Sequence, residues 1–121
     1  MSWTHDRTYQ YLRAHGYVAE RAGSYNARTR RTRDFLGIID IIAFKGQDTV
    51  GIQVTSASNV SARVKKANAS ELLPKWLEGG TRRMEVWGWR KGERGDKALR
   101  IVGITREVDN GHLVTIREEE K

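Results

Sequence analysis

Three polar residues in two apolar segments have the types and spacing for metal chemistry. Asp40 is the only acid in a run of mostly apolar residues over 35–44. A bare carboxylate is costly to bury, so it must be paired, hydrogen-bonded or bound to a cation. Gln53 and Thr55 lie two residues apart within a second segment, 49–55, so in a strand both point to one face. A carboxylate beside a carbonyl oxygen suits a hard divalent cation. The alternatives without a metal are, for Asp40, a strand-end position at a sheet edge or a salt bridge to an Arg, and, for Gln53 and Thr55, a solvated strand face.

The elements that must position these residues follow from apolar spacing and turn signals. Residues 35–44 are predicted as a buried central strand, because the run is β-branched and almost continuous. The short turn over 45–48 makes 49–55 its antiparallel hairpin partner, which brings Asp40 toward Gln53. Before these two strands we predict a helix over 4–15, a strand over 16–21 and a polar loop over 22–33. After them we predict a helix that begins at Val60, is divided by Pro74 and ends at Gly79-Gly80. The last predicted elements are a strand over 82–89, a charged hairpin tip over 90–98, and strands over 99–105 and 112–117 joined by Asp109-Asn110-Gly111.

This order predicts an α/β fold with a mixed central β-sheet flanked by helices, in a single domain over 1–121. The chain resembles the PD-(D/E)xK nuclease superfamily in two features. One is the element order helix, three strands, helix, strand, and the other is the pair of segments 36–43 and 51–56. It is most similar to the small Holliday-junction-resolvase-like and phage members, over residues 4–89. The resemblance implies a restriction-endonuclease-like core, order α-β-β-β-α-β plus a C-terminal strand pair, and a DNA endonuclease that hydrolyses phosphodiesters with Mg²⁺ or Mn²⁺. Branched DNA as substrate and a homodimer are further implications.

The family's site residues carry over to the two apolar segments with departures. Asp40 matches the family's Asp, Gln53 stands where Glu is usual, and Thr55 stands where Lys is usual. The implied metal ligands are Asp40, the Gln53 side chain and the Val54 carbonyl. An amide oxygen carries no charge, so metal affinity is expected to fall. Gly37 stands where the family's strand bends.

Two further catalytic groups are implied by the resemblance, an acid from the first helix and a replacement for the missing lysine. The lysine would come from the helix that follows the second strand, as in some members of the superfamily. The alternative to each basic candidate is a helix face that contacts DNA backbone. The candidates are Asp6, His5 and Glu20 for the acid, and Lys65, Lys66 and Arg63 for the lysine.

The charge favours a nucleic-acid partner. The chain has 22 Lys and Arg against 15 Asp and Glu, a net charge of +7. Four arginines fall within residues 28–33 among polar neighbours, and guanidinium groups match phosphate oxygens. A solvated basic loop and ordinary helix capping by residues 56–59 are the alternatives. The predicted nucleic-acid-binding residues are Arg28, Arg30, Arg31, Arg33, Ser56, Ser58, Asn59, Arg63 and Lys66.

Several chemistries and compartments are disfavoured. The chain has no cysteine, which excludes disulfides, zinc–thiolate sites and cysteine nucleophiles. No apolar run reaches the roughly 18 residues of a membrane span, so we expect no membrane partner and a cytoplasmic location. The resemblance implies that this is the cytoplasm of a bacterial, archaeal or phage-infected cell. Trp87 and Trp89 share a strand face; packing or a protein interface is the first interpretation, and base stacking the second.

Two other function classes compete with the enzyme. Gln53 and Thr55 depart from the family pattern, which favours a catalytically inactive nuclease fold that binds DNA or RNA. A protein-interaction module built on the tryptophan strand is the third class, and it predicts weak binding to DNA that responds little to salt.

Overall fold

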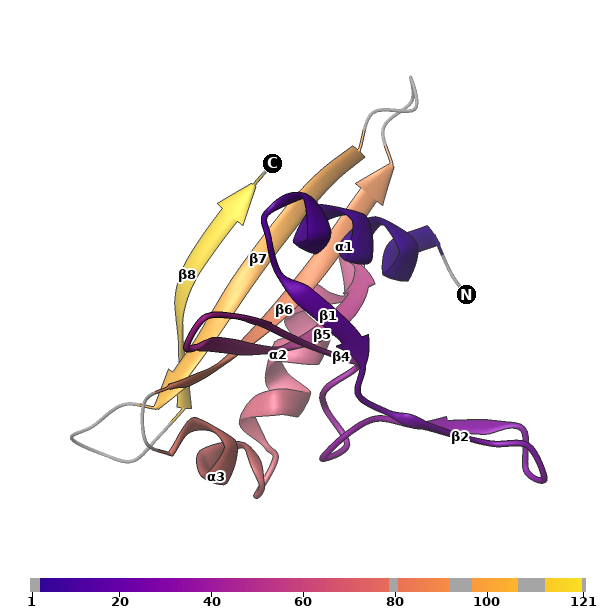
Figure 1. Ribbon diagram of the computed structural model, residues 1–121. Helices are drawn as coiled ribbons and strands as arrows, with labels where there is room; N and C mark the ends of the chain where they lie inside the picture. Colours follow the sequence, from indigo (N-terminus) through magenta and orange to yellow (C-terminus); the bar gives the residue numbers. More distant parts are fainter. Residues whose placement is uncertain (1–2, 79–80, 92–96, 107–112, 121) are drawn as a thin grey trace.

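The computed structural model describes residues 3–78, 81–91, 97–106 and 113–120, and it forms a six-stranded mixed sheet with helices on both faces (Figure 1). This confirms the α/β prediction. The elements are α1 (Trp3–Ala14), β1 (Val18–Arg21), β2 (Ser24–Asn26), β3 (Arg31–Arg33), β4 (Ile41–Lys45), β5 (Asp48–Ser56), the 3₁₀ turn η1 (Ala57–Asn59), α2 (Val60–Asn68), α3 (Leu73–Leu77), β6 (Arg82–Lys91), β7 (Lys97–Arg106) and β8 (Leu113–Glu120).

The sheet has the strand order β1-β4-β5-β6-β7-β8. β5 and β6 are parallel, and the other neighbouring strands are antiparallel. Parallel neighbours need a crossover connection, which η1, α2 and α3 supply. The β4–β5 hairpin is confirmed, with Ile41 opposite Ile52. Asp40 therefore stands at the beginning of β4, beside the second half of β5.

The core has two parts because alternate residues of each strand face opposite sides of the sheet. Leu12 of α1 packs with Ile41 and Val50 on one face. Val60 of α2 and Trp76 of α3 pack on the other face. The elements that flank the sheet are thus fixed to it by buried apolar side chains.

Trp87 and Trp89 belong to the core under α1 and are each 3% exposed. The indole N–H of Trp89 donates to the hydroxyl of Thr8, which in turn donates to the Thr4 carbonyl. Packing of this tryptophan pair is confirmed. The interpretations as a protein interface or as a base-stacking face are wrong, because α1 covers both tryptophans.

The apolar run over 35–44 is not one strand, which corrects the prediction. β4 begins only at Ile41, and Phe35 and Ile39 form two backbone hydrogen bonds of 2.9 Å across a tight turn. Leu36 and Gly37 close this turn in the left-handed region, at φ 55° and 76°. Ile39 remains fully buried. A packed turn and a buried strand have the same apolar composition, so the run alone did not separate them.

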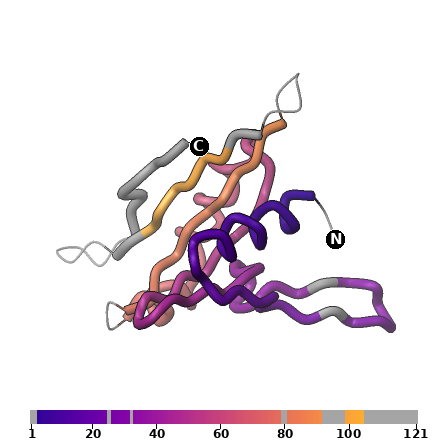
Figure 2. Tube along the Cα trace, turned by 45° about the horizontal axis from the view of Figure 1, so that its top comes forward, coloured from indigo at the N-terminus to yellow at the C-terminus, as the bar shows by residue number. Residues whose placement is uncertain are grey.

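The arginine-rich segment is also more regular than the predicted polar loop over 22–33. β2 and β3 pair antiparallel, with Ser24 opposite Arg33 and Asn26 opposite Arg31. They form a separate two-stranded ribbon that projects from the body of the molecule (Figures 1 and 2). We call residues 24–33 the arm. Its strands lack an apolar alternation, which is why the sequence predicted a loop.

The helical connection between β5 and β6 differs in detail from the prediction. The chain leaves the helix after Asn68, and Pro74 lies in the first turn of α3. Neither Ser56 nor Asn59 makes a side-chain capping bond, because η1 begins the connection instead. In the described ranges no helix is long and apolar enough to cross a membrane. Gly79-Gly80, most of the charged tip and Asp109-Asn110-Gly111 lie outside the described residues.

Candidate functional site

The tight turn before β4 brings a second carboxyl group beside Asp40. Because Phe35 and Ile39 pair with each other, the residues just outside that pair, Asp34 and Asp40, face one another. A hydrogen bond between the two carboxyl groups follows from this placement. Asp34 directly follows the arm and Asp40 directly precedes β4, so one short turn assembles an acidic pair.

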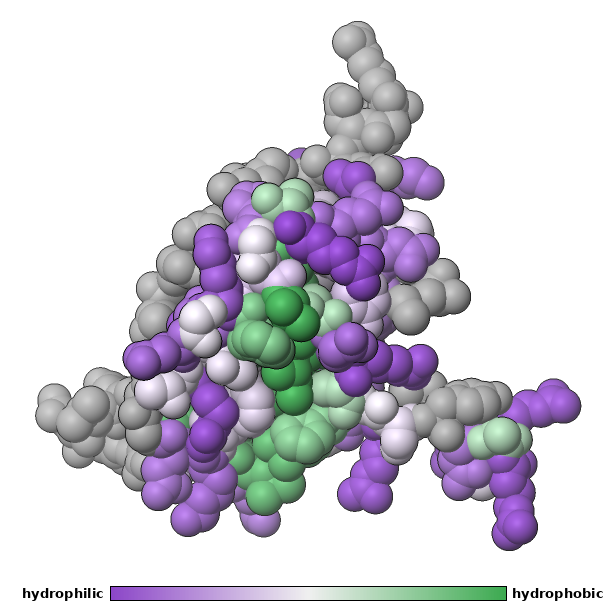
Figure 3. Space-filling view, in the orientation of Figure 1, coloured by the Kyte–Doolittle hydropathy of each residue, from purple (hydrophilic) through white to green (hydrophobic). Residues whose placement is uncertain are grey.

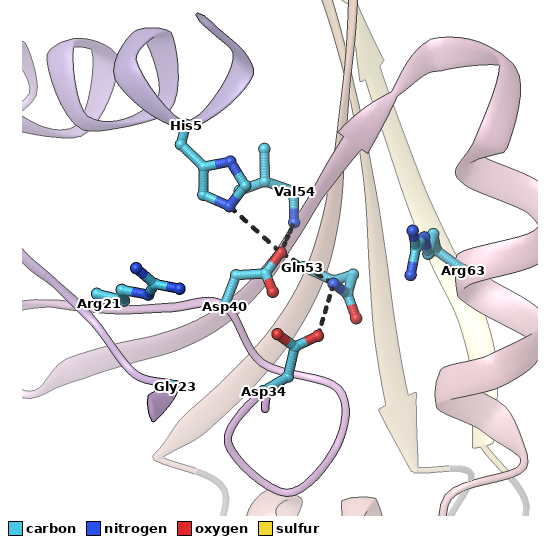
Figure 4. A pocket seen from close by; sticks show the side chains of 8 residues that line it. All are labelled: His5, Arg21, Gly23, Asp34, Asp40, Gln53, Val54 and Arg63. Atoms are coloured by element: carbon cyan, nitrogen blue, oxygen red, sulfur yellow. Dashed lines mark hydrogen bonds and ion pairs between the residues drawn. The ribbon is translucent and has the colours of Figure 1, made fainter. Parts of the chain in front are cut away.

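The acidic pair lies in a pocket of about 310 Å³ at the beginning of β4 (Figure 4). α1 contributes His5, β5 contributes Gln53 and Val54, and α2 contributes Arg63. In Figure 4 the two carboxyl groups lie between Arg21 on one side and Arg63 on the other. The other lining residues are Arg21, Gly23, Asp34 and Asp40.

Gln53 and Val54 hold the carboxyl groups in place. The Gln53 amide nitrogen donates to Asp40 Oδ2 at 2.9 Å and to Asp34 Oδ2 at 3.4 Å. The backbone N–H of Val54 donates to Asp40 Oδ2 at 2.9 Å. His5 Nε2 lies 3.7 Å from the same oxygen. Gln53 is 3% exposed, so its amide bridges the two acids out of contact with most solvent.

The two carboxyl groups have opposite pKa shifts, as expected for a pair that shares a proton. Burial, followed by the hydrogen bond with Asp40, raises the pKa of Asp34 above its ordinary value. Burial would also raise the pKa of Asp40, but hydrogen bonds from His5, Asp34 and the Val54 N–H lower it overall. Asp40 is therefore the carboxylate of the pair, and Asp34 is the member that keeps its proton to higher pH.

The face of α2 toward the pocket is cationic. Arg63 lines the pocket, and the charge of Lys66, three residues further along the helix, lowers the pKa of Asp34. Residues three apart lie on the same side of a helix. Lys65 is exposed and does not line the pocket. Of the three basic candidates for the missing lysine, Arg63 is the one at the pocket.

The structure brings together only some of the other predicted residues. Among the candidate acids, Asp6 and Glu20 are exposed and do not line the pocket, whereas His5 does. Thr55 is 7% exposed and does not line it either. The predicted nucleic-acid-binding residues fall in three places: Arg28, Arg30, Arg31 and Arg33 on the arm; Ser56, Ser58 and Asn59 around η1; Arg63 and Lys66 on α2.

Asp34 and Arg21 are pocket residues that the sequence did not single out. The signal for Asp34 was available: two aspartates flank a five-residue segment that contains Gly37, which is typical of a tight hairpin. Arg21 carried no signal, because its place depends on how β1 pairs with β4.

Comparisons of the chain with protein families, with curated proteins and with solved structures found no match. Within the described part of the chain, no group of three or more His, Asp or Glu side chains is arranged to hold a metal ion.

Proposed function

We propose that the protein is a divalent-metal-dependent DNA endonuclease with a restriction-endonuclease-like core. The single observation that carries the proposal is the acidic pair, Asp34 and Asp40, in a pocket lined by two arginines. Acidic oxygens next to guanidinium groups suit a cation and a phosphodiester bound side by side. The order α1, β1, β4, β5, α2, β6, with β5 and β6 parallel, supports the core that the sequence resemblance implies.

The donor set fits Mg²⁺ or Mn²⁺, because these cations prefer oxygen ligands. Asp34 and Asp40 would supply charged oxygens. The side chain of Gln53 would supply a neutral oxygen after its amide rotates by half a turn. The Val54 carbonyl leaves β5 on the same side as the Val54 N–H, which already contacts Asp40. In the structure the Gln53 amide nitrogen donates to both acids, so this side chain already lies beside the two groups that would hold a cation.

The chain's own residues would bind and orient the substrate. Arg21 and Arg63 would hold oxygens of the phosphodiester on the two sides of the acidic pair. Arg63 would also stabilise the negative charge that develops on the phosphorus oxygens, the role of the family's lysine. His5 Nε2 would take a proton from the attacking water, since it lies beside Asp40. A bound cation would add Lewis-acid polarisation of the phosphodiester.

The test is a cutting assay on four-way-junction, single-stranded and linear duplex DNA with Mn²⁺, Mg²⁺ or EDTA. We expect cutting that requires metal and is lost in Asp40→Asn and Asp34→Asn. The matched control is Asp6→Asn, the same change at an exposed position outside the pocket, which should cut like the unmodified protein. Equal cutting by Asp40→Asn would refute the assigned site. No cutting of any substrate in any metal would refute the enzyme.

A second candidate function is a catalytically inactive nuclease fold that binds nucleic acid. The observation in its favour is that, among the residues the structure describes, no lysine lines the pocket, and Thr55, at the lysine's usual place, is buried. Isothermal titration with Mn²⁺ separates the two candidates. The enzyme requires a Mn²⁺ site that Asp40→Asn abolishes, whereas the binder requires DNA affinity without such a site.

Branched DNA as the substrate and a homodimer remain proposals that rest on the sequence resemblance. Preferential cutting of the four-way junction in the assay above would support the first. Light scattering of the protein, alone and with a junction, tests the second. A monomer in both measurements would contradict the dimer.

A further inference from the structure

The arm is a cationic ribbon in which no described side chain is buried. Its residues with described side chains are exposed: Ser24, Asn26, Ala27, Arg28, Thr29, Arg30, Arg31 and Arg33. Figure 3 shows mainly hydrophilic side chains along it. An isolated two-stranded ribbon is only marginally stable in water, so this shape is suited to a surface against which the ribbon can pack.

The tip of the arm has a defined turn. The side-chain oxygen of Asn26 accepts hydrogen bonds from the backbone N–H groups of Arg28, at 2.9 Å, and Thr29, at 3.4 Å. Arg30 has a φ of 57°, in the left-handed region that closes tight turns. The turn thus presents Arg28 and Arg30 at the end of the ribbon instead of in a random loop.

One face of the arm can form hydrogen bonds along its length. Arg31 and Arg33 are two residues apart, so their side chains leave the same face of β3. The register places Asn26 and Ser24 opposite them on β2. No acid occurs between Glu20 and Asp34. This face therefore offers positive charge and hydrogen-bond donors, with no carboxylate among the arm's own residues.

The base of the arm is part of the pocket. Gly23 and Asp34, which flank the arm, both line the pocket. A Cβ at position 23 would lie 2.6 Å from the Arg33 carbonyl oxygen, so the two strands approach as closely as a glycine allows. Whatever the arm binds is consequently held at a fixed place relative to Asp34 and Asp40.

The shape of the arm selects the major groove of a duplex. The major groove, about 12 Å wide, admits a two-stranded β-ribbon in undistorted B-DNA, whereas the minor groove, about 6 Å wide, must first be widened at an energetic cost. From Gly23 to Ala27 the strand extends roughly 13 Å at ~3.3 Å per residue. That reach corresponds to about four base pairs at ~3.4 Å each.

We propose that the arm lies in the major groove of double-stranded DNA and positions the duplex so that a backbone phosphate about four base pairs from the arm tip enters the pocket. This inference rests on the proposed DNA substrate and narrows it to a duplex segment beside the cutting position. Arg31 and Arg33 lie along the groove and, like Arg28 at the tip, contact phosphates at its edges.

The test measures equilibrium binding to a 30-base-pair duplex in EDTA, where cutting does not interfere. The arm variant is Arg28→Gln/Arg31→Gln/Arg33→Gln, which leaves Arg30 and the turn intact. The matched control is Arg13→Gln/Lys75→Gln/Arg90→Gln, which removes the same charge from exposed positions outside the arm and the pocket. Circular dichroism checks that both variants remain folded.

We expect the slope of log affinity against log salt to fall by about 2.7 in the arm variant, since each lost phosphate contact contributes about 0.9. The control should change the slope by less than about 1. Methyl green, a major-groove ligand, should displace the protein, and distamycin, a minor-groove ligand, should not. Equal slopes in the two variants would overturn the inference, as would displacement by distamycin alone.

The outcomes for the arm and for the nuclease are separate. Duplex binding that depends on the arm, without cutting in any metal, would refute the nuclease and leave the arm's role standing. Metal-dependent cutting of a duplex, with binding unchanged in the arm variant, would refute the arm's role and support the nuclease.

Discussion

Replacing Asp34 by Asn should stabilise the metal-free protein at neutral pH. Asp34 and Asp40 share a hydrogen bond, and the Gln53 amide donates to both. Once both carboxyl groups are ionised they repel each other. In Asp34→Asn the new amide is neutral and can donate to the Asp40 carboxylate, so a repulsive contact becomes an attractive one.

The magnitude follows from the charges in the pocket. Two like charges 4 Å apart repel by about 4 kcal/mol at an effective dielectric constant of 20. The nearby Arg63 and Lys66 offset part of this repulsion, and the Gln53 bond to residue 34 weakens by about 1 kcal/mol when its acceptor becomes neutral. A net gain of about 1–2 kcal/mol in the free energy of unfolding remains, which raises Tm by roughly 3–8 °C for a domain of this size.

Thermal unfolding followed by circular dichroism from pH 4 to pH 8, in EDTA, measures this gain. Because the pKa of Asp34 is raised in the folded protein, its stabilising contribution is present at low pH and is lost as pH rises through that pKa. The difference in Tm between Asp34→Asn and the unmodified protein should therefore be absent at the acid end of the range and increase toward neutral pH. Mn²⁺ should raise Tm of the unmodified protein and leave Tm of the variant nearly unchanged.

Asp48→Asn is a matched control, for which the expected change in the free energy of unfolding at neutral pH has the opposite sign. Asp48 accepts two bonds from Arg83, at 2.7 and 2.8 Å, and the hydrogen bonds from Arg83 lower its pKa. Its stabilising contribution is present above the unfolded pKa and lost as pH falls through the folded pKa. This exposed pair should contribute about 1 kcal/mol at pH 7. If Asp34→Asn were the less stable protein at pH 7, or its difference in Tm from the unmodified protein did not change with pH, the reasoning about the acidic pair would be refuted.

Three other substitutions test the packing and the site. Gly88→Ala should lower the free energy of unfolding by about 1–3 kcal/mol, because the new Cβ would lie 2.2 Å from Val60 Cγ2. Urea unfolding measures this loss of stability, and an unchanged midpoint would contradict the packing of α2 on β6. Thr8→Val should lower the free energy of unfolding by about 1–3 kcal/mol in the same assay, since the buried indole N–H of Trp89 loses its acceptor. A decrease below about 0.5 kcal/mol would argue against the hydrogen bond between Trp89 and Thr8. Arg63→Gln should slow cutting by about 100-fold with stability nearly unchanged, and an unchanged rate would remove Arg63 from the site.

Local patterns were enough to predict the elements that hold the candidate site. The β4–β5 hairpin followed from two apolar segments and a short polar turn, and its pairing brought Asp40 to Gln53 as expected. The helical connection before β6 followed from apolar spacing and Pro74. These features depend on residues close together in the chain, so the sequence displays them directly.

The second carboxyl group and the arm needed the structure. A continuous apolar run has the same composition whether it is a strand or a turn packed in the core, so the turn at Gly37 and the place of Asp34 were not predicted. The arm has no apolar alternation, and its pairing shows only in the backbone register. A short polar hairpin and a polar loop look alike in sequence.

By itself, the sequence determined the basic charge, the mixed α/β order and the carboxylate–amide pair of Asp40 and Gln53. Only the tertiary structure decided that His5, and not Asp6, reaches the pocket, and that Arg63, and not Lys65, faces it. A helix presents adjacent residues in different directions, and the side that faces a neighbour is set by which apolar side chains the core buries. That choice is made between segments distant in the chain, where local spacing carries no information.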